Sequence, residues 1–158
     1  MLLDYRKDID GLRALAVLLV VFFHAGFPIS GGFVGVDIFF VISGFLIASL
    51  IQKQILRDKF TFKGFYLHRM RRILPALLLV VMATFIFNWL FLMPMPFDFF
   101  IRSGFFSLLS LSNMFFWKNL GSYFSTKTEE VHLLHTWSLS VEEQFYIAVP
   151  IFLILLFK

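Results

Sequence analysis

Long apolar segments separated by polar stretches dominate the pattern of this chain. The segments run from about Leu12 to Pro28, about Phe33 to Ile51, Ile73 to Met93, about Phe97 to Trp117, and Trp137 to Phe157. Each has the length, about 20 residues, that a helix needs to cross a bilayer, and none shows the two-residue alternation of a barrel strand. Because spanning backbone must satisfy its own hydrogen bonds, the pattern predicts an all-α fold, a polytopic transmembrane helical bundle with about five spans.

The composition points to the lipid bilayer as the partner of this chain. The 158 residues are 59% hydrophobic and 15% charged, whereas soluble domains average about 45–50% and about 25%. A soluble domain of this size has too little interior to bury so much apolar surface. The chain has no cysteine, which excludes a disulfide framework, a thiolate metal site and a cysteine nucleophile, and we expect no metal.

Basic residues gather beside the apolar segments and predict the orientation. The link from Gln52 to Arg72 carries seven lysines and arginines against one acid, Asp58. The positive-inside rule therefore places this link in the cytoplasm, and alternation places the N-terminus there as well. The net charge of +4 thus follows from membrane topology, and we expect no nucleic-acid partner.

The first apolar segment contains ionisable residues that are costly in a membrane. Arg13 and His24 are eleven residues apart, which is about three helical turns, so they share a helix face about 16 Å apart. Asp10 lies close enough to Arg13 for a local ion pair. One interpretation makes Arg13 an interface anchor, Asp10 an N-cap and His24 a structural residue. The other makes His24 a general base or an acyl carrier.

The second segment opens with the glycine-rich stretch 31–35. Its glycines permit either a close approach of two backbones or a broken helix. Asp37 follows, and it could cap the helix or orient a neighbouring histidine. Ser43 and Gly44 form a small-residue notch against which another helix can pack.

The basic link ends in an arginine pair before the third segment. Arg69 and Arg72 share a face if that turn is helical, and Pro75 fits the first turn of the predicted third helix. Paired guanidinium groups bind phosphate oxygens well. Anchoring at the cytoplasmic surface or contact with anionic lipid is the alternative role.

The fourth segment carries a polar stripe. Asp98 and Arg102 have the spacing of a local ion pair. A line of small polar residues follows on one predicted helix face, and we interpret it as a helix-packing surface or the wall of a polar cavity. The stripe consists of Ser103, Ser107, Ser110 and Asn113.

The fifth segment opens with a polar stretch, residues 135–146, that includes His135, Trp137 and Glu142. Ser140 and Glu143 have the spacing of a capping box, which explains one glutamate without any function. So many polar groups at the mouth of an apolar span suggest a site.

Four of these stretches, in order, resemble the membrane-bound acyltransferase 3 family. They are residues 5–14 leading to His24, residues 35–47, residues 69–75 and residues 135–146. The resemblance extends over nearly the whole chain. It implies a bacterial inner-membrane enzyme that transfers acyl groups, usually acetyl from acetyl-CoA, to carbohydrate such as lipopolysaccharide, peptidoglycan or exopolysaccharide. Family members have about ten spans, so residues 1–158 are expected to be the N-terminal portion of a longer transmembrane domain.

The resemblance also implies roles for particular residues. The family's arginine–histidine pattern falls on Arg13 and His24, which with Glu142 become the expected catalytic residues. Its Arg-x-x-Arg motif falls on Arg69 and Arg72, expected near the phosphates of acetyl-CoA. Residues expected to contact substrate or support the site are Asp10, Asp37, Ser43, His135, Trp137 and Glu143.

Two other functions fit intramembrane His, Arg and Glu. A small-molecule transporter or flippase uses such groups along its pathway. An inactive membrane fragment is the third hypothesis. Transfer of labelled acetyl groups in membranes separates the first hypothesis from these two.

Overall fold

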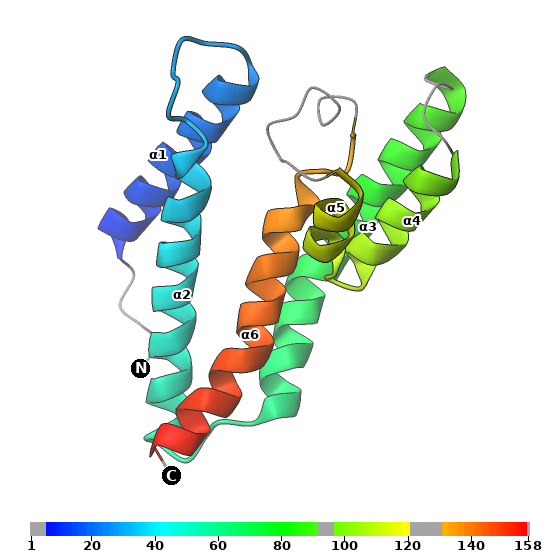
Figure 1. Ribbon diagram of the computed structural model, residues 1–158. Coiled ribbons are helices and arrows are strands. Elements are labelled where there is room, and N and C mark those ends of the chain that lie inside the picture. The colour runs from blue at the N-terminus through cyan, green and yellow to red at the C-terminus, as the bar shows by residue number, and fades with distance from the viewer. Residues whose placement is uncertain (1–5, 92–96, 121–130, 158) are drawn as a thin grey trace. The chain divides into compact units, whose positions relative to one another are not determined.

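Helices make up most of the computed structural model, which describes residues 6–91, 97–120 and 131–157 (Figure 1). Within these ranges there is no strand. The helices are α1 (Lys7–His24), α2 (Val34–Ile55), α3 (Phe62–Phe91), α4 (Phe97–Leu108), α5 (Ser112–Leu120) and α6 (Thr136–Phe157). The predicted all-α fold is therefore confirmed.

Three of the described helices, α2, α3 and α6, are long and apolar enough to cross a membrane. They correspond to the second, third and fifth predicted segments and make the chain a multi-pass membrane protein. Helix α1 covers most of the first segment with 18 residues, but charged side chains occupy its first two turns, among them Asp10 and Arg13. It does not meet the same standard of length and composition.

The fourth segment differs from the prediction, because a turn divides it into α4 and α5. Ser110 adopts a left-handed conformation with φ 57°. Its N–H donates to the carbonyl of Ser107, and the N–H of Leu111 donates to that of Phe106, as in a Schellman motif. The prediction of one helix through Trp117 is wrong, and neither short helix has spanning length.

Helix α3 begins eleven residues before the predicted third segment. The basic stretch from Lys63 to Arg72 is therefore helical rather than part of a link, and Pro75 lies inside the helix instead of in its first turn. The carbonyl of Arg71 consequently lacks the backbone donor that another residue at position 75 would supply. Lysine and arginine are good helix formers, so they extend the apolar helix at its beginning.

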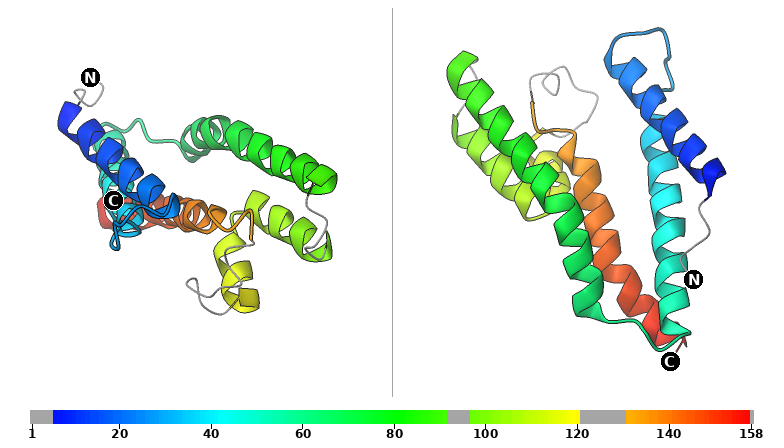
Figure 2. Two further views of the ribbon diagram at one scale, coloured as in Figure 1. Left: turned by 90° about the horizontal axis from the view of Figure 1, so that it is seen from above. Right: turned by 180° about the vertical axis from the view of Figure 1, so that it is seen from behind.

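Residues 6–60 and 145–157 form one unit, in which α1 packs against α2 (Figure 2). Two glycines make this contact possible. A Cβ at Gly32 would lie 2.5 Å from the carbonyl oxygen of Leu19, and a Cβ at Gly35 would lie 2.5 Å from that of Ala16. The glycine-rich stretch therefore serves a close approach of two backbones.

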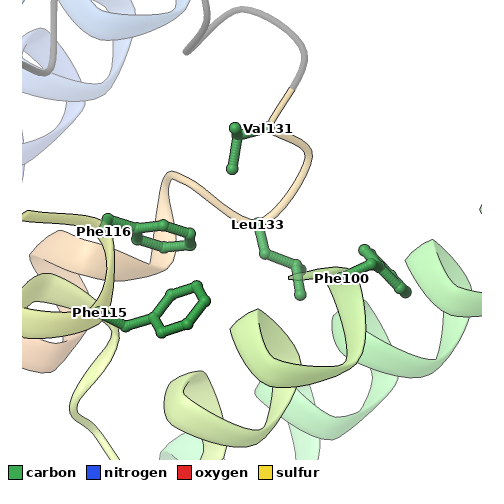
Figure 3. Packing of buried hydrophobic residues seen from close by; sticks show 5 residues of the cluster. All are labelled: Phe100, Phe115, Phe116, Val131 and Leu133. Carbon is green, nitrogen blue, oxygen red and sulfur yellow. The ribbon is translucent and has the colours of Figure 1, made fainter. Parts of the chain in front are cut away.

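Residues 61–120 and 131–144, within the described ranges, form the second unit. Its apolar core joins α4, α5 and the segment that leads into α6 (Figure 3). The buried residues of this core are Phe100, Phe115, Phe116, Val131 and Leu133. The core fixes the beginning of α6, where the polar stretch of the fifth segment lies.

Candidate functional site

Arg13 and His24 lie on the same helix, α1, as predicted. Arg13 is half-buried and His24 is exposed in the described structure. His24 is the last residue of α1, and Gly26, with φ 76°, ends the helix. Phe22 and Phe27 pack across this end with ring centroids 5.2 Å apart, the apolar contact that accompanies such a cap. The helix end therefore has a defined geometry.

One nitrogen of the His24 ring is engaged by the backbone. Nδ1 lies 2.8 Å from the carbonyl oxygen of Val20. A carbonyl only accepts, so Nδ1 carries the proton and donates it. In the neutral ring the lone pair is then on Nε2, which can accept a proton from a hydroxyl group. The local structure thus holds His24 in a tautomer suited to a general base.

Asp10 has neither of its two predicted roles at the beginning of α1, the N-cap or the ion pair with Arg13. The N-cap position is Arg6, whose guanidinium pairs with Asp8. The hydrogen bond that the Arg6 guanidinium donates to the Asp8 carboxylate lowers the pKa of Asp8 to about 2. Asp10 is exposed inside the first turn, and in the described residues it forms no ion pair with Arg13. Its position still favours the positive end of the helix dipole.

Asp37 and Ser43 lie on α2. Asp37 is exposed in the first turn, and the N-cap position is Phe33, so Asp37 does not cap the helix. The hydroxyl of Ser43 donates to the carbonyl of Phe39, 2.8 Å away in the same helix. Gly44 provides the predicted notch, since Phe145 of α6 lies in ordinary van der Waals contact with the position of its missing side chain.

Arg69 and Arg72 differ in their exposure to solvent. Both lie in the helical beginning of α3, as the shared-face prediction required. Arg69 is buried, with 8% of its surface exposed, whereas Arg72 is exposed along with Arg71 and His68. The motif thus presents one outward guanidinium and one inward guanidinium.

Some residues of the polar stretch at the beginning of α6 pack inside the second unit, and others are exposed to solvent. Helix α6 begins at Thr136, so Ser140 lies inside the helix and the predicted capping box with Glu143 is wrong. Trp137 packs against the apolar core of the second unit. His135 keeps an exposed surface, yet nearby atoms desolvate its ring and lower its pKa, which favours a neutral imidazole at pH 7.

A chain of buried hydroxyl groups joins α4, α5 and α6. The Thr136 hydroxyl lies 2.8 Å from that of Ser107 and 3.1 Å from that of Ser112. Ser112 in turn lies 2.7 Å from the hydroxyl of Ser140. These side chains are 0–2% exposed. The serine stripe is therefore a helix-packing surface, one of the two predicted roles.

Gln144 fastens α6 to the turn between α4 and α5. Its amide exchanges two hydrogen bonds with the amide of Asn113, at 3.1 and 2.9 Å. Its Nε2 also donates to the carbonyl of Ser110, 3.0 Å away. Sequence reasoning did not give Gln144 a role. The available signal was the polar stripe, because Ser110 and Asn113 belong to it and need polar partners, which the polar beginning of α6 supplies.

Glu142 and Glu143 are half-buried on α6. The charges of Arg69 and Glu142 both act on the Glu143 carboxyl group. Of the two carboxyl oxygens of Glu143, Oε1 is buried and has no hydrogen-bond partner in the described ranges. The second unit thus brings Arg69 and the two glutamates, predicted from separate motifs, into one electrostatic cluster.

The described residues contain no group of three or more His, Asp or Glu side chains arranged to hold a metal ion. The candidate residues fall into two separate sets of polar side chains, one in each unit. One set, on α1 and α2, comprises Asp10, Arg13, His24, Asp37 and Ser43. The other, on α3, on α6 and just before α6, comprises Arg69, Arg72, His135, Glu142 and Glu143.

The amino-acid sequence of this chain matches a known protein family. The family model described as "Acyltransferase domain" matches residues 6–158. The peptidoglycan O-acetyltransferase OatA of Listeria monocytogenes is 37% identical over 156 residues, 98% of this chain and 25% of that protein. The O-acetyltransferase OatA of Staphylococcus aureus is 36% identical over 149 residues, 93% of this chain and 24% of that protein.

A third relative, YrhL of Bacillus subtilis, is 40% identical over 153 residues, 95% of this chain and 24% of that protein. The chain therefore spans about a quarter of the length of these relatives. No solved structure matches it.

Proposed function

Because the chain belongs to the acyltransferase domain family, we propose that it takes part in O-acyl transfer at a bacterial membrane. The proposed donor is acetyl-CoA, and the proposed acceptor is a hydroxyl group of a cell-envelope or exported carbohydrate. The family match over residues 6–158 carries this proposal. The names of two relatives, both O-acetyltransferases, support acetyl over other acyl groups.

His24 is the proposed general base. Its Nε2 takes the proton of the acceptor hydroxyl, and the oxygen then attacks the thioester carbonyl carbon. The carbon–sulfur bond breaks, and the departing CoA thiolate takes up the proton. The contact between Nδ1 and the Val20 carbonyl supports this role, because it keeps the lone pair on Nε2. A transient acyl group on the same nitrogen is the alternative route.

The remaining family positions receive supporting roles. Arg13, half-buried on the same helix but about three turns from His24, is proposed to position the acyl donor. Arg72, exposed beside Arg71 and His68, fits the phosphates of acetyl-CoA. Glu142 is proposed as a further acid–base group of the reaction.

The proposed location is the cytoplasmic membrane, with the N-terminus and the beginning of α3 inside. Acetyl-CoA is then available to the cationic beginning of α3, where Lys63, Arg71 and Arg72 are exposed. The same proposed topology places His24, at the end of α1, toward the outside, so the long pantetheine arm of acetyl-CoA or a substrate cavity has to bridge the two sides. Among cell-envelope carbohydrates, peptidoglycan is the first acceptor to test, since the name of the Listeria relative specifies it. Lipopolysaccharide, expected from the resemblance alone, has no such support.

The test is transfer of labelled acetyl groups from acetyl-CoA to envelope carbohydrate by membranes that contain the protein. Mass spectrometry of isolated peptidoglycan and other glycans identifies the product. We expect O-acetylated sugar that disappears on mild alkaline treatment, because esters are hydrolysed by base. Membranes that transfer no label to any glycan, despite normal protein levels, would contradict acyl transfer and leave the transporter and the inactive membrane fragment as the remaining hypotheses.

A further inference from the structure

The second unit contains a buried charge that the proposed reaction leaves unexplained. Arg69 on α3 is the only buried Lys, Arg, Asp or Glu residue among residues 6–91, 97–120 and 131–157. Burying a guanidinium costs free energy unless an anion lies close to it. The position of Arg69 therefore calls for a carboxylate nearby.

Glu143 on α6 is such a carboxylate, and it needs a hydrogen-bond donor in turn. Its Oε1 atom is buried without a hydrogen-bond partner in the described ranges, and a buried carboxylate oxygen needs a donor. The charge of Arg69 acts on this carboxyl group. A guanidinium is the donor best matched to a carboxylate, because its planar fork can bind both oxygens.

We propose that Glu143 is a positioning residue that holds the guanidinium of Arg69. The Arg-x-x-Arg motif then has two different arms. Arg69 is the inner arm, oriented by a carboxylate on α6, and Arg72 is the exposed arm that meets the donor. This inference rests on the proposed function only for the identity of the ligand, since the pairing of α3 with α6 can be tested without any activity.

The pairing is tested by double-cysteine cross-linking. The 158 residues contain no cysteine, so cysteines introduced at Arg69 and Glu143 are the only thiols within this chain. A short bis-methanethiosulfonate reagent should bridge them in native membranes, and intact-mass spectrometry detects the bridge. The matched control combines Glu143→Cys with Leu67→Cys. Leu67 is exposed on α3 and two residues from Arg69, about 200° around the helix.

The positioning role is tested by donor kinetics in the whole protein. Glu143→Gln should raise KM for acetyl-CoA by about tenfold and change kcat far less, because it frees Arg69 and so disturbs the arginine motif that binds the donor, not a reacting group. Glu143→Asp, which keeps the charge, should recover most of the donor affinity. Asp98→Asn serves as control, since Asp98 belongs to an exposed ion pair with Arg102.

A double-mutant cycle separates positioning from a general structural role. If Glu143 acts through Arg69, the variant with both Arg69→Gln and Glu143→Gln should have the same KM as Arg69→Gln alone. The inference would be overturned if the two substitutions raised KM by factors that multiply in the double variant, or if positions 69 and 143 failed to cross-link. If wild-type membranes transfer no acetyl group, the proposed function fails, and the cross-link alone then decides the pairing.

Discussion

His24 combines an exposed ring with a defined tautomer at the end of α1. The Val20 carbonyl accepts from Nδ1, and the glycine at position 26 ends the helix immediately after it. A histidine placed only for packing does not need a free Nε2. At this scale the difference between a structural and a chemical role lies in whether the side chain must bind a proton.

The substitution His24→Gln tests that difference. Glutamine keeps a hydrogen-bonding amide group and much of the bulk, but it cannot take up a proton near neutral pH. We expect normal insertion and a loss of acyl transfer of about 10²–10⁴-fold. The measurement is acetylation of the acceptor by mass spectrometry, normalised to the protein level in the membrane.

The matched control for this substitution is His132→Gln, at an exposed histidine ahead of α6. This variant should retain wild-type transfer. Near-normal acetylation by His24→Gln would return His24 to a packing role and remove the general base from the proposed mechanism.

Helix contacts in this chain depend on small and hydroxyl-bearing residues. Glycines 32 and 35 let α1 and α2 approach closely, and hydroxyl groups join α4, α5 and α6. Both devices suit a membrane, where apolar burial does not drive helices together and close packing and hydrogen bonds do. The stability of these elements should therefore respond to very small changes of side chain.

Gly35→Ala should loosen the contact between α1 and α2. The added methyl group would lie 2.5 Å from the Ala16 carbonyl and 2.8 Å from Val20, so the two helices must shift apart. We expect a loss of about 1–3 kcal/mol, seen as a lower melting temperature in detergent. Gly31→Ala is the control, because nothing lies within 4 Å of its Cβ position. Equal melting temperatures for the two variants would argue against the close approach.

Thr136→Val tests the hydroxyl chain. Valine keeps the shape of threonine but removes the hydroxyl that contacts Ser107 and Ser112. At a position 2% exposed, we expect a loss of about 1–2 kcal/mol in the free energy of unfolding, measured by denaturant titration in micelles. Thr84→Val, whose hydroxyl bonds only within α3, should change it by less than about 0.5 kcal/mol. A similar loss in both variants would contradict a specific role for the chain.

The pattern of apolar residues predicted α2, α3 and α6, but not the break after α4. Ser110 takes a left-handed conformation that glycine usually supplies, and the neighbouring residues Leu109 and Leu111 give no turn signal. The break is stabilised from outside by Gln144 of α6. Such a tertiary contact has no local signature in the sequence.

At the scale of the whole molecule, the motifs were predictable and their partners were not. Spacing placed Arg69 and Arg72 on one helix, but it could not show that Arg69 is buried and influenced by Glu143. Likewise, the serine stripe predicted packing but not the hydroxyl of Thr136 as its partner. Residues more than 20 positions apart come into contact only through the tertiary fold, so the periodicity of the sequence does not predict these contacts.

The orientation of the chain in the membrane is the last prediction. Seven basic residues between Gln52 and Arg72, several of them exposed at the end of α2 and the beginning of α3, predict a cytoplasmic location for this end. The link between α1 and α2 should then face the outside. Because the 158 residues have no cysteine, single cysteines can report each side.

Lys59→Cys should resist a membrane-impermeant thiol reagent in intact cells and react once the membrane is permeabilised. Ser30→Cys, an exposed and nearly isosteric change in the link between α1 and α2, is the matched control and should react in intact cells. Labelling is read by mass shift of the purified protein. The reverse pattern would place the cationic beginning of α3 outside, away from cytoplasmic acetyl-CoA, and the proposed contact between Arg72 and the donor would then fail with it.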